Sequence, residues 1–431
     1  MRWIWGVVVA WGLAGLGWAQ EWQRVEVRTP HYDLVGWGTE EEVRGWSVVL
    51  EAAWGELDGV LQARPKLEAG KRLEFRMYPD EAARKEALLA VRQAAPTAAV
   101  PVWFSPIDKV VYAYRTPSVV YARMMVIYGA VLQFHGLCKD KNLDLDATWF
   151  VHGLAQTLCV HEWDGKRIEF AVQPRLCVID YPAKALAALG GERFGVDPWN
   201  EERMRDPYVN WAAVRFALEG VGKKYRAKYQ KLALGHTGSK LSGADFLRSL
   251  GREKDVTKEF HDWLVAEQYP LAVCNGDWED RPDGYVLGGS HDPKLLSAAL
   301  LRAPRTSLDV RLHGIARPGS SPSVVLAWQD DANYVLGHAL PPHFVIDFVR
   351  NGGQVDQQKF ALPASAVDSV LVSMEQLETK ANAIRKRVAE RPGSVKLALD
   401  GTSLGSIAVY DGPIGLAMLG GIGEFSALAY R

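Results

Sequence analysis

The sequence predicts an α+β domain, with a mixed sheet followed by helices, and then an all-β antiparallel sandwich. The chain has 431 residues, which exceeds the size at which a single hydrophobic core usually stops growing. Strands alternate with helices early in the chain, and helical periodicity then dominates from about residue 118 to residue 267. Beyond about residue 275, short apolar runs are divided by Gly, Pro and Asp turns, as antiparallel strands are.

The first domain is predicted over residues 20–272. Thr39 is followed by three glutamates and is expected to cap a helix that continues to Val60. Residues 73–78 alternate between apolar and polar side chains, which is typical of a strand with one buried face. Residues 270–275 follow the last helical pattern and are expected to link the two domains.

The second domain is predicted over residues 273–431. Strands are expected at residues 307–312, 323–328, 343–350, 395–399 and 425–430. One segment departs from this pattern, because residues 374–390 carry Leu377, Ala381 and Val388 at helical spacing. We therefore predict a helical insertion between two strands of the sandwich, near residues 374–390.

The composition is that of an ordinary globular protein, with 48% hydrophobic and 23% charged residues. Lys and Arg total 50 and Asp and Glu total 51, so neither sign of charge dominates. Proteins that bind nucleic acid or an anionic membrane surface through bulk charge carry an excess of basic residues. The charge balance therefore predicts no nucleic-acid partner.

Residues 1–19 have the order of a secretory signal peptide. Arg2 supplies a positive start, residues 3–17 form an apolar and glycine run, and Ala19 precedes the expected cleavage point. A retained N-terminal anchor is the alternative, although the run is shorter than the ~20 residues of a full span. The sequence shows no other such apolar segment, so we expect a secreted or periplasmic protein with no membrane span after signal cleavage.

The cysteines of the chain are Cys138, Cys159, Cys177 and Cys274. An oxidising compartment permits disulfides, and four cysteines allow three complete pairings. Their spacing contains no C-x-x-C pair, so a structural zinc site is not predicted. The spacing leaves one disulfide bridge and four buried thiols equally open.

Two consecutive helices carry the pattern on which the functional prediction rests. Residues 121–137 form an apolar helix, and the next helix contains Trp149, Gly153 and Ala155 with the spacing W-x-x-x-G-x-A. At these residues the chain resembles the gluzincin-type zinc metallopeptidases. In that family H-E-x-x-H on the first helix supplies two zinc ligands and a general base, because residues four apart share a helix face. A W-x-x-E-G-x-A motif on the second helix supplies the third ligand.

The resemblance, which covers roughly residues 24–268, implies that the zinc-binding side chains have been replaced. Tyr128 and Leu132 stand at the two histidine positions. Gly129 stands at the position of the general base, and His152 at that of the ligand glutamate. Catalytic zinc requires about three protein ligands and an open water position. Leucine cannot bind the ion and glycine cannot accept a proton, so we expect no metal, no cofactor and no catalytic residue here.

A rearranged zinc site is the alternative. His135 continues the helix face of Tyr128 and Leu132, and His161 follows the helix that carries His152. The set His135, His152 and His161 would supply three imidazole ligands in such a site. No two of these histidines have the spacing of a known ligand pair, so this hypothesis rests on proximity alone.

The second domain is similar to the concanavalin-like (LamG-like) sandwich domains. The resemblance rests on Trp278, on the strand–turn run at residues 395–401 and on the Gly-Pro-Ile-Gly-Leu run at residues 412–416. It implies a glycan as one possible ligand. Trp328 and Tyr334 are candidates for stacking on sugar rings, with packing in the sandwich core as the simpler interpretation. Glycan hydrolysis requires two carboxylates at a set separation, and the sequence shows no such pair.

Two functions follow from these observations. The first is an exported, non-catalytic pseudo-metallopeptidase that acts as a binding or scaffold protein, with a glycan or another exported protein as its partner. The alternative is a hydrolase, either a metallopeptidase with the rearranged zinc site or a glycan-active sandwich. Stoichiometric zinc in the purified protein would separate the two hypotheses.

Overall fold

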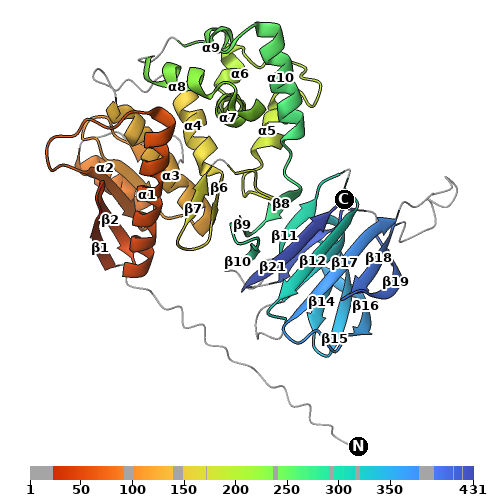
Figure 1. Ribbon diagram of the computed structural model, residues 1–431. Coiled ribbons are helices and arrows are strands. Elements are labelled where there is room, and N and C mark those ends of the chain that lie inside the picture. Colours follow the sequence, from red (N-terminus) through yellow and green to blue (C-terminus); the bar gives the residue numbers. More distant parts are fainter. Residues whose placement is uncertain are drawn as a thin grey trace, which may run out of the picture.

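The computed structural model describes most of the chain as two bodies (Figure 1). It covers residues 23–91, 101–138, 149–170, 172–235, 241–290, 296–303, 305–315, 321–377, 393–410, 412–419 and 421–431. The predicted signal peptide, residues 1–19, lies outside these ranges. Most of the predicted helical insertion also lies outside them, because residues 378–392 are not described.

The first body begins with a mixed sheet and continues with helices, which is the order that the sequence predicts. Its described strands are β1 (Gln23–Arg28), β2 (Tyr32–Gly38), β3 (Leu73–Tyr78), β4 (Val102–Phe104), β5 (Val111–Tyr114), β6 (His161–Trp163) and β7 (Ile168–Phe170). Its described helices are α1 (Glu40–Leu61), α2 (Glu81–Ala90), α3 (Val119–Cys138), α4 (Trp149–Cys159), α5 (Tyr181–Ala188), α6 (Glu201–Met204), α7 (Pro207–Glu219), the 3₁₀ turn η1 (Val221–Lys223), α8 (Arg226–Gly235), α9 (Gly243–Leu250) and α10 (Glu253–Ala266).

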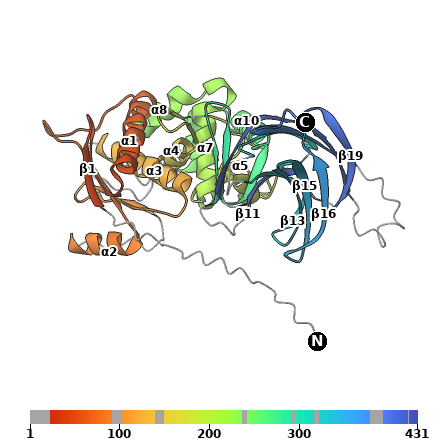
Figure 2. The same ribbon diagram turned by 90° about the horizontal axis from the view of Figure 1, so that it is seen from below.

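The main sheet of the first body has the order β1-β2-β3-β5-β4 in the described residues. Strands β2, β3 and β5 run parallel, and β1 and β4 pair antiparallel at the two edges. Side chains alternate across the sheet, so Phe75 and Met77 enter the main core with α1 and α3. Tyr78 packs with Leu88 of α2 in a smaller cluster on the other face. Figure 2 shows α2 on the side of the sheet away from α1 and α3.

Helix α3 is buried on nearly all sides between this sheet and α4. An apolar sequence without a polar face is what such a position requires. Helix α4 in turn packs closely on α7 at Gly153. A Cβ atom at this position would lie 2.5 Å from the backbone oxygen of Asn210, so the glycine of the W-x-x-x-G-x-A pattern is required for helix packing.

The second body is a β-sandwich, which confirms this part of the predicted fold class. Its described strands are β8 (Leu271–Asn275), β9 (Asp277–Asp280), β10 (Val286–Ser290), β11 (Leu296–Leu301), β12 (Ser307–His313), β13 (Pro322–Asp330), β14 (Asn333–Leu340), β15 (His343–Arg350), β16 (Gly353–Ala361), β17 (Ser369–Leu377), β18 (Gly393–Leu399), β19 (Thr402–Val409), β20 (Gly415–Leu419) and β21 (Gly421–Tyr430). In the described residues they form two sheets, of order β19-β18-β17-β12-β21-β10-β9 and β16-β15-β14-β13-β20-β11-β8. The inner faces of the two sheets share one hydrophobic core.

Two expectations about the second body are wrong. The segment predicted as a linker forms β8, the edge strand beside β11, because Leu271 is buried in the sandwich core. The start of the predicted helical insertion, Met374 to Leu377, belongs to β17. Val370, Val372 and Met374 all point into the core, so every second side chain is buried, as in a strand. This alternation, and not the helical spacing of the apolar residues, determines the structure of the segment.

None of the helices in the described ranges has both the length and the apolar character needed to cross a membrane.

Candidate functional site

The structure brings Tyr128 and His152 into direct contact. The Tyr128 hydroxyl lies 2.5 Å from Nδ1 of His152, and the two ring centroids are 5.8 Å apart. Burial raises the pKa of Tyr128 and lowers the pKa of His152, so both side chains are neutral near pH 7. Both side chains are partly buried, and we call these two residues the buried pair. They stand at two of the positions that the resemblance to metallopeptidases assigns to zinc ligands.

The other two aligned positions are filled by packing. Leu132 lies one turn after Tyr128 on α3 and is buried in the main core. Gly129 points at the sheet, because a Cβ atom there would lie 2.6 Å from Cγ2 of Val102 and 2.8 Å from Cγ1 of Val111. The close approach of α3 to the sheet therefore leaves no space for a general base at position 129.

The rearranged zinc site is not present in the described residues. His135 is buried with its ring against Phe150 at a centroid distance of 5.7 Å. His161 lies on strand β6, and Nε2 of this histidine accepts a 2.8 Å hydrogen bond from Nε of Arg123. Its Nδ1 donates to the backbone oxygen of Cys159 at 2.8 Å, so neither nitrogen is free to bind a metal. The described ranges contain no group of three or more His, Cys, Asp or Glu side chains placed to hold a metal ion.

No disulfide joins any of the four cysteines, all of which lie in the described ranges. Cys159 is buried and Sγ of this residue donates to the backbone oxygen of Met124. Burial raises the pKa of Cys159 well above its usual range, which disfavours the thiolate that a nucleophile requires. This environment argues against a reactive Cys159–histidine pair. Of the two alternatives that the spacing left open, the structure contains no disulfide bridge between the four cysteines.

The sequence did not reveal the polar contacts that join the two bodies. Arg123 on α3 forms an ion pair with Glu279 on β9, and both side chains are largely buried. Asp277 Oδ2 accepts from the backbone N–H of Val119 at the start of α3, at 3.1 Å. Asp280 accepts from Arg175 Nε at 2.8 Å. Two features of the sequence indicated buried ion pairs, namely an arginine within an apolar helix and the acidic run at residues 277–280. Neither feature indicates which residue its partner is.

Burial dominates the titration of this interface. It lowers the pKa of His161 to about 3, with a further contribution from the positive charge of Arg123. It raises the pKa of Glu279 to about 7, against the opposing effect of Arg123. Burial also lowers the pKa of Arg123, so it disfavours the charged form of both partners of the ion pair. The ion pair is therefore costly to bury, and its geometry is held by the docking of the two bodies.

A groove lies beside this interface, where the first body meets β9. Its volume is about 520 Å³. The groove is lined mainly by aromatic, proline and aliphatic side chains, among them Pro101, Tyr114, Pro117, Tyr121 and Val178, and Asp277 contributes a carboxylate.

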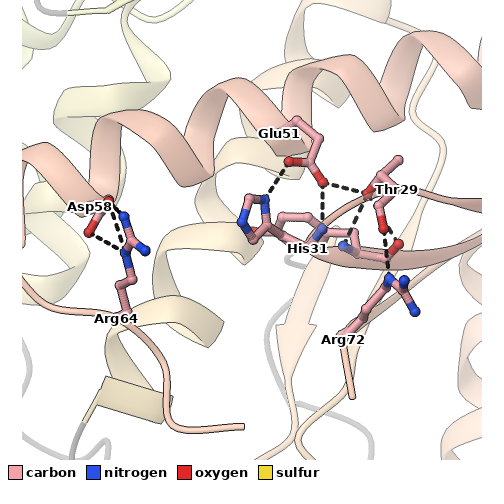
Figure 3. A network of polar contacts seen from close by, with 7 residues as sticks. Thr29, His31, Glu51, Asp58, Arg64 and Arg72 are labelled. Atoms are coloured by element: carbon pink, nitrogen blue, oxygen red, sulfur yellow. Dashed lines mark hydrogen bonds and ion pairs between the residues drawn. The ribbon is translucent and has the colours of Figure 1, made fainter. Parts of the chain in front are cut away.

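A second polar network holds the start of the sheet against α1 (Figure 3). Glu51 accepts from the Thr29 hydroxyl at 2.5 Å and from the backbone N–H of His31 at 2.9 Å. Its other oxygen lies 2.6 Å from Nδ1 of His31, whose ring stacks on Trp54 at 4.1 Å. Burial opposes ionisation of Glu51, but these hydrogen bonds lower its pKa below the usual value. The network ties the β1–β2 turn to the helix and is accounted for by that role.

On the sandwich, the two residues proposed for sugar stacking lie against each other. Trp328 and Tyr334 are cross-strand neighbours with ring centroids 5.5 Å apart, and Trp328 is only 7% exposed. They belong to an apolar cluster on the face of the sheet opposite the main core. Trp328 is therefore a packing residue, and the expectation that it stacks on a sugar is wrong because its ring is covered.

The same sheet carries a chain of polar contacts across β13 to β16. Nε2 of His338 lies 2.9 Å from Oδ2 of Asp347, and Gln357 donates to the other oxygen of Asp347 at 2.7 Å. The Ser321 hydroxyl lies 3.4 Å from Nδ1 of His338. The order serine, histidine, aspartate is the order of a nucleophile, its base and the group that orients the base.

The other sheet has a hollow on its outer face, which we call the trough. Its volume is about 530 Å³. The trough lies over β12, β17, β18 and β19 and is lined mainly by polar side chains, among them Ser307, Asp309, Ser373, Glu375, Lys396 and Ser403. The sequence did not single out any of these residues, because their position depends on the pairing of strands far apart in the chain.

Comparisons with known proteins add little to this description. A comparison with protein-family models gave no match, and a comparison with curated protein sequences gave none. A carbohydrate-binding module, CBM66, from Bacillus subtilis is 14% identical, covers 38% of this chain and 95% of its own, and has a TM-score of 0.26. Sheep galectin-11 is 10% identical, covers 32% of this chain and 97% of its own, and has a TM-score of 0.23. The galectin LEC-6 from Caenorhabditis elegans is 9% identical, covers 30% of this chain and 87% of its own, and has a TM-score of 0.20.

Proposed function

We propose that this chain is an exported, non-catalytic binding or scaffold protein that acts in a secreted or periplasmic setting. In this proposal the first body is a metallopeptidase-like domain whose zinc site has been replaced by a hydrogen bond. The hydrogen bond of the buried pair, Tyr128 with His152, is the observation that carries the proposal. The partner is a glycan or another exported protein.

The chemistry of the buried pair supports a loss of hydrolysis. A catalytic zinc ion needs about three ligands, and it activates water by lowering the pKa of that water. Tyr128 is neutral because burial raises its pKa, and its hydroxyl already takes up Nδ1 of His152. Leu132 offers no donor atom. Position 129, where the base would stand, is closed by the sheet.

Zinc analysis of a rebuilt site tests this proposal. We design a triple variant with Tyr128→His, Leu132→His and His152→Glu. It places two histidine ligands on α3 and one glutamate ligand on the adjacent helix α4. We expect the wild-type protein to purify without stoichiometric zinc, and the triple variant to bind about one zinc ion that a chelator removes. The metal content of both proteins is measured by plasma mass spectrometry after dialysis against zinc.

The control is the double variant Tyr128→His with His152→Glu, which provides one ligand fewer and should bind zinc weakly. Chelator-sensitive zinc in the wild-type protein, together with cleavage of a casein substrate, would overturn the proposal. A triple variant that folds but binds no zinc would show that the three positions do not form a metallopeptidase-like site.

A hydrolase is the second candidate, and one observation favours it. Ser321, His338 and Asp347 lie in the order that serine hydrolases use. The 3.4 Å separation of the serine and the histidine exceeds the ~3.2 Å limit of an ordinary hydrogen bond, so the serine is not activated in this arrangement. A fluorophosphonate probe tests the arrangement. Labelling of the wild-type protein that Ser321→Ala abolishes would establish the hydrolase, and we expect no labelling.

A further inference from the structure

The trough owes its shape to the register of four strands. Asp309, Ser373, Ala398 and Ser403 lie in one row across β12, β17, β18 and β19. Ser373, Ala398 and Ser403 have short side chains, so the row forms a low floor. Glu375 pairs with Lys396 in the next row, where the Lys396 Nζ lies 3.1 Å from Oε2 of Glu375. These long side chains stand above the floor and form one wall.

Strand alternation directs these residues away from the core. Leu308, Met374 and Leu397 are buried in the sandwich, so their chain neighbours on each strand face the opposite side. Residues Ser307, Asp309, Ser373, Glu375, Lys396 and Ala398 are therefore presented together on the outer face. The hollow is a property of the sheet itself and does not depend on a loop.

Three polar side chains of the trough are not used by the fold. In the part of the chain that the structure describes, the side chains of Ser307, Asp309 and Ser373 have no hydrogen-bond or ion-pair partner. Each hydroxyl can donate one hydrogen bond and accept two, and the carboxylate of Asp309 can accept several. On this outer face the groups are hydrated, so they remain available to a ligand at little cost to the fold.

The chemistry of the lining selects a class of ligand. Hydroxyl and carboxylate groups match the vicinal hydroxyls of a sugar, which donate and accept in the same way. Lys396 is paired with Glu375, and the two remaining charged side chains of the lining, Asp309 and Arg431, have opposite signs. The side chains of the lining therefore carry no net charge, which suits a neutral ligand better than an ionic one. The volume of about 530 Å³ lies within the usual range of ~300–1,000 Å³ for small-molecule sites.

We infer that the trough is a binding site for a neutral saccharide. The inference rests on the proposed role of the chain as a binding protein and names the site and the ligand class for that role. Asp309 and the hydroxyls of Ser307 and Ser373 bind the sugar hydroxyls, and Ala398 leaves the space in which a ring lies. The site is distinct from the Trp328–Tyr334 cluster, which belongs to the other sheet.

Calorimetry with defined sugars tests this inference on the full mature chain. The probes are the neutral tetrasaccharides cellotetraose, xylotetraose, mannotetraose and chitotetraose, with tetragalacturonate as the anionic comparison. We expect at least one neutral probe to bind and tetragalacturonate to bind at least tenfold more weakly. Ala398→Arg, which fills the floor, and Asp309→Ala should each weaken binding at least tenfold. Asp331→Ala, on the exposed turn between β13 and β14, is the matched control and should leave binding unchanged.

The outcomes separate this inference from the proposed function. Absence of binding to every neutral probe would overturn the inference, and so would binding that Ala398→Arg and Asp309→Ala leave intact. Thermal unfolding of each variant shows whether a loss of binding comes from a loss of fold. Zinc content and peptidase activity are measured on the same samples, so a failure of the non-catalytic proposal is visible independently of sugar binding.

Discussion

The polar groups on α3 and those on the outer face of β12, β17, β18 and β19 are placed in opposite ways. On α3, Tyr128 is bonded to His152 and Arg123 is paired with Glu279, all inside the protein. On the sheet face, Asp309 and Ser373 line an open hollow. Tyr128 and Arg123 on α3 thus each have an internal partner. The side chains of Asp309 and Ser373 have none among the described residues.

The difference follows from the cost of burying a polar group. Within the helices, an unpaired hydroxyl or imidazole costs about 1–3 kcal/mol, so a polar group there requires an internal partner. On a sheet face the outward side chains remain in water, and leaving them unpaired costs little. Polar groups inside the helical body are therefore fixed by their partners, whereas those on the sheet face remain available to a ligand.

The largest expected effect comes from restoring the general base of the peptidase motif. Gly129→Glu puts a side chain where a Cβ atom alone would lie 2.6 Å from Val102 and 2.8 Å from Val111. Overpacking and burial of an unpaired carboxylate together should lower the free energy of unfolding by at least about 4 kcal/mol. Urea unfolding followed by tryptophan fluorescence measures the change.

Gly55→Glu is the matched control for this substitution. Gly55 lies on α1, is exposed, and would place its Cβ atom more than 4 Å from any neighbour. We expect a change within about 0.5 kcal/mol there. If Gly129→Glu is tolerated as well as Gly55→Glu, position 129 faces an open cleft and the contrast between the two regions fails.

A smaller effect is expected in the pH dependence of stability at the interface of the two bodies. Burial raises the folded-state pKa of Glu279 to about 7, whereas the unfolded carboxyl titrates near ~4.5. The folded protein therefore holds a proton that the unfolded chain releases between these two values. The stabilising contribution is complete below about pH 4.5 and is lost as the pH rises to about 7, by roughly 3 kcal/mol.

The Glu279→Gln variant lacks this titrating group, so the difference between its pH profile of stability and that of the wild type measures the contribution of Glu279. Between pH 5 and pH 8 the wild-type protein should lose about 2.5 kcal/mol more stability than the Glu279→Gln variant. Arg123 and Arg281 oppose the pKa shift, while Asp277 and Asp280 reinforce it. Glu26→Gln, on the exposed strand β1, should follow the wild-type profile. Identical profiles for wild type and Glu279→Gln would mean that the carboxylate is hydrated and the interface open.

The sequence predicted the features that arise from residues close together in the chain, and it missed contacts between residues far apart in the chain. The mixed sheet, the apolar helix α3 and the sandwich follow from periodicities that are local in the chain. Tyr128 and His152 were brought together at the sequence level only by the resemblance, which aligned both with zinc-ligand positions. The Arg123–Glu279 pair joins residues 156 positions apart, and it exists only because the two bodies dock.

The trough lay beyond prediction for a related reason. Asp309 and Ser373 face each other through a strand pairing that crosses 64 positions, counted from their residue numbers. No local pattern marks that register. The incorrect helix at residues 374–377 came from the same limit, because Leu377 fits both a helical spacing and the end of a strand. Only the buried side chains of the neighbouring strand β12 decide between the two.

The smallest effect we predict comes from removing one oxygen atom from the buried pair. Tyr128→Phe leaves Nδ1 of His152 without its partner in a region where burial already lowers the pKa of that histidine. The free energy of unfolding should fall by about 1–2 kcal/mol, which is the cost of an unsatisfied buried group. Tyr121→Phe, two turns earlier on the same helix and beside the groove, should change stability by less than about 0.5 kcal/mol. Equal effects from the two substitutions would show that water reaches His152 and replaces the lost hydroxyl. The buried pair would then be an accessible polar site like the trough, and the distinction between a closed and an open region would no longer hold.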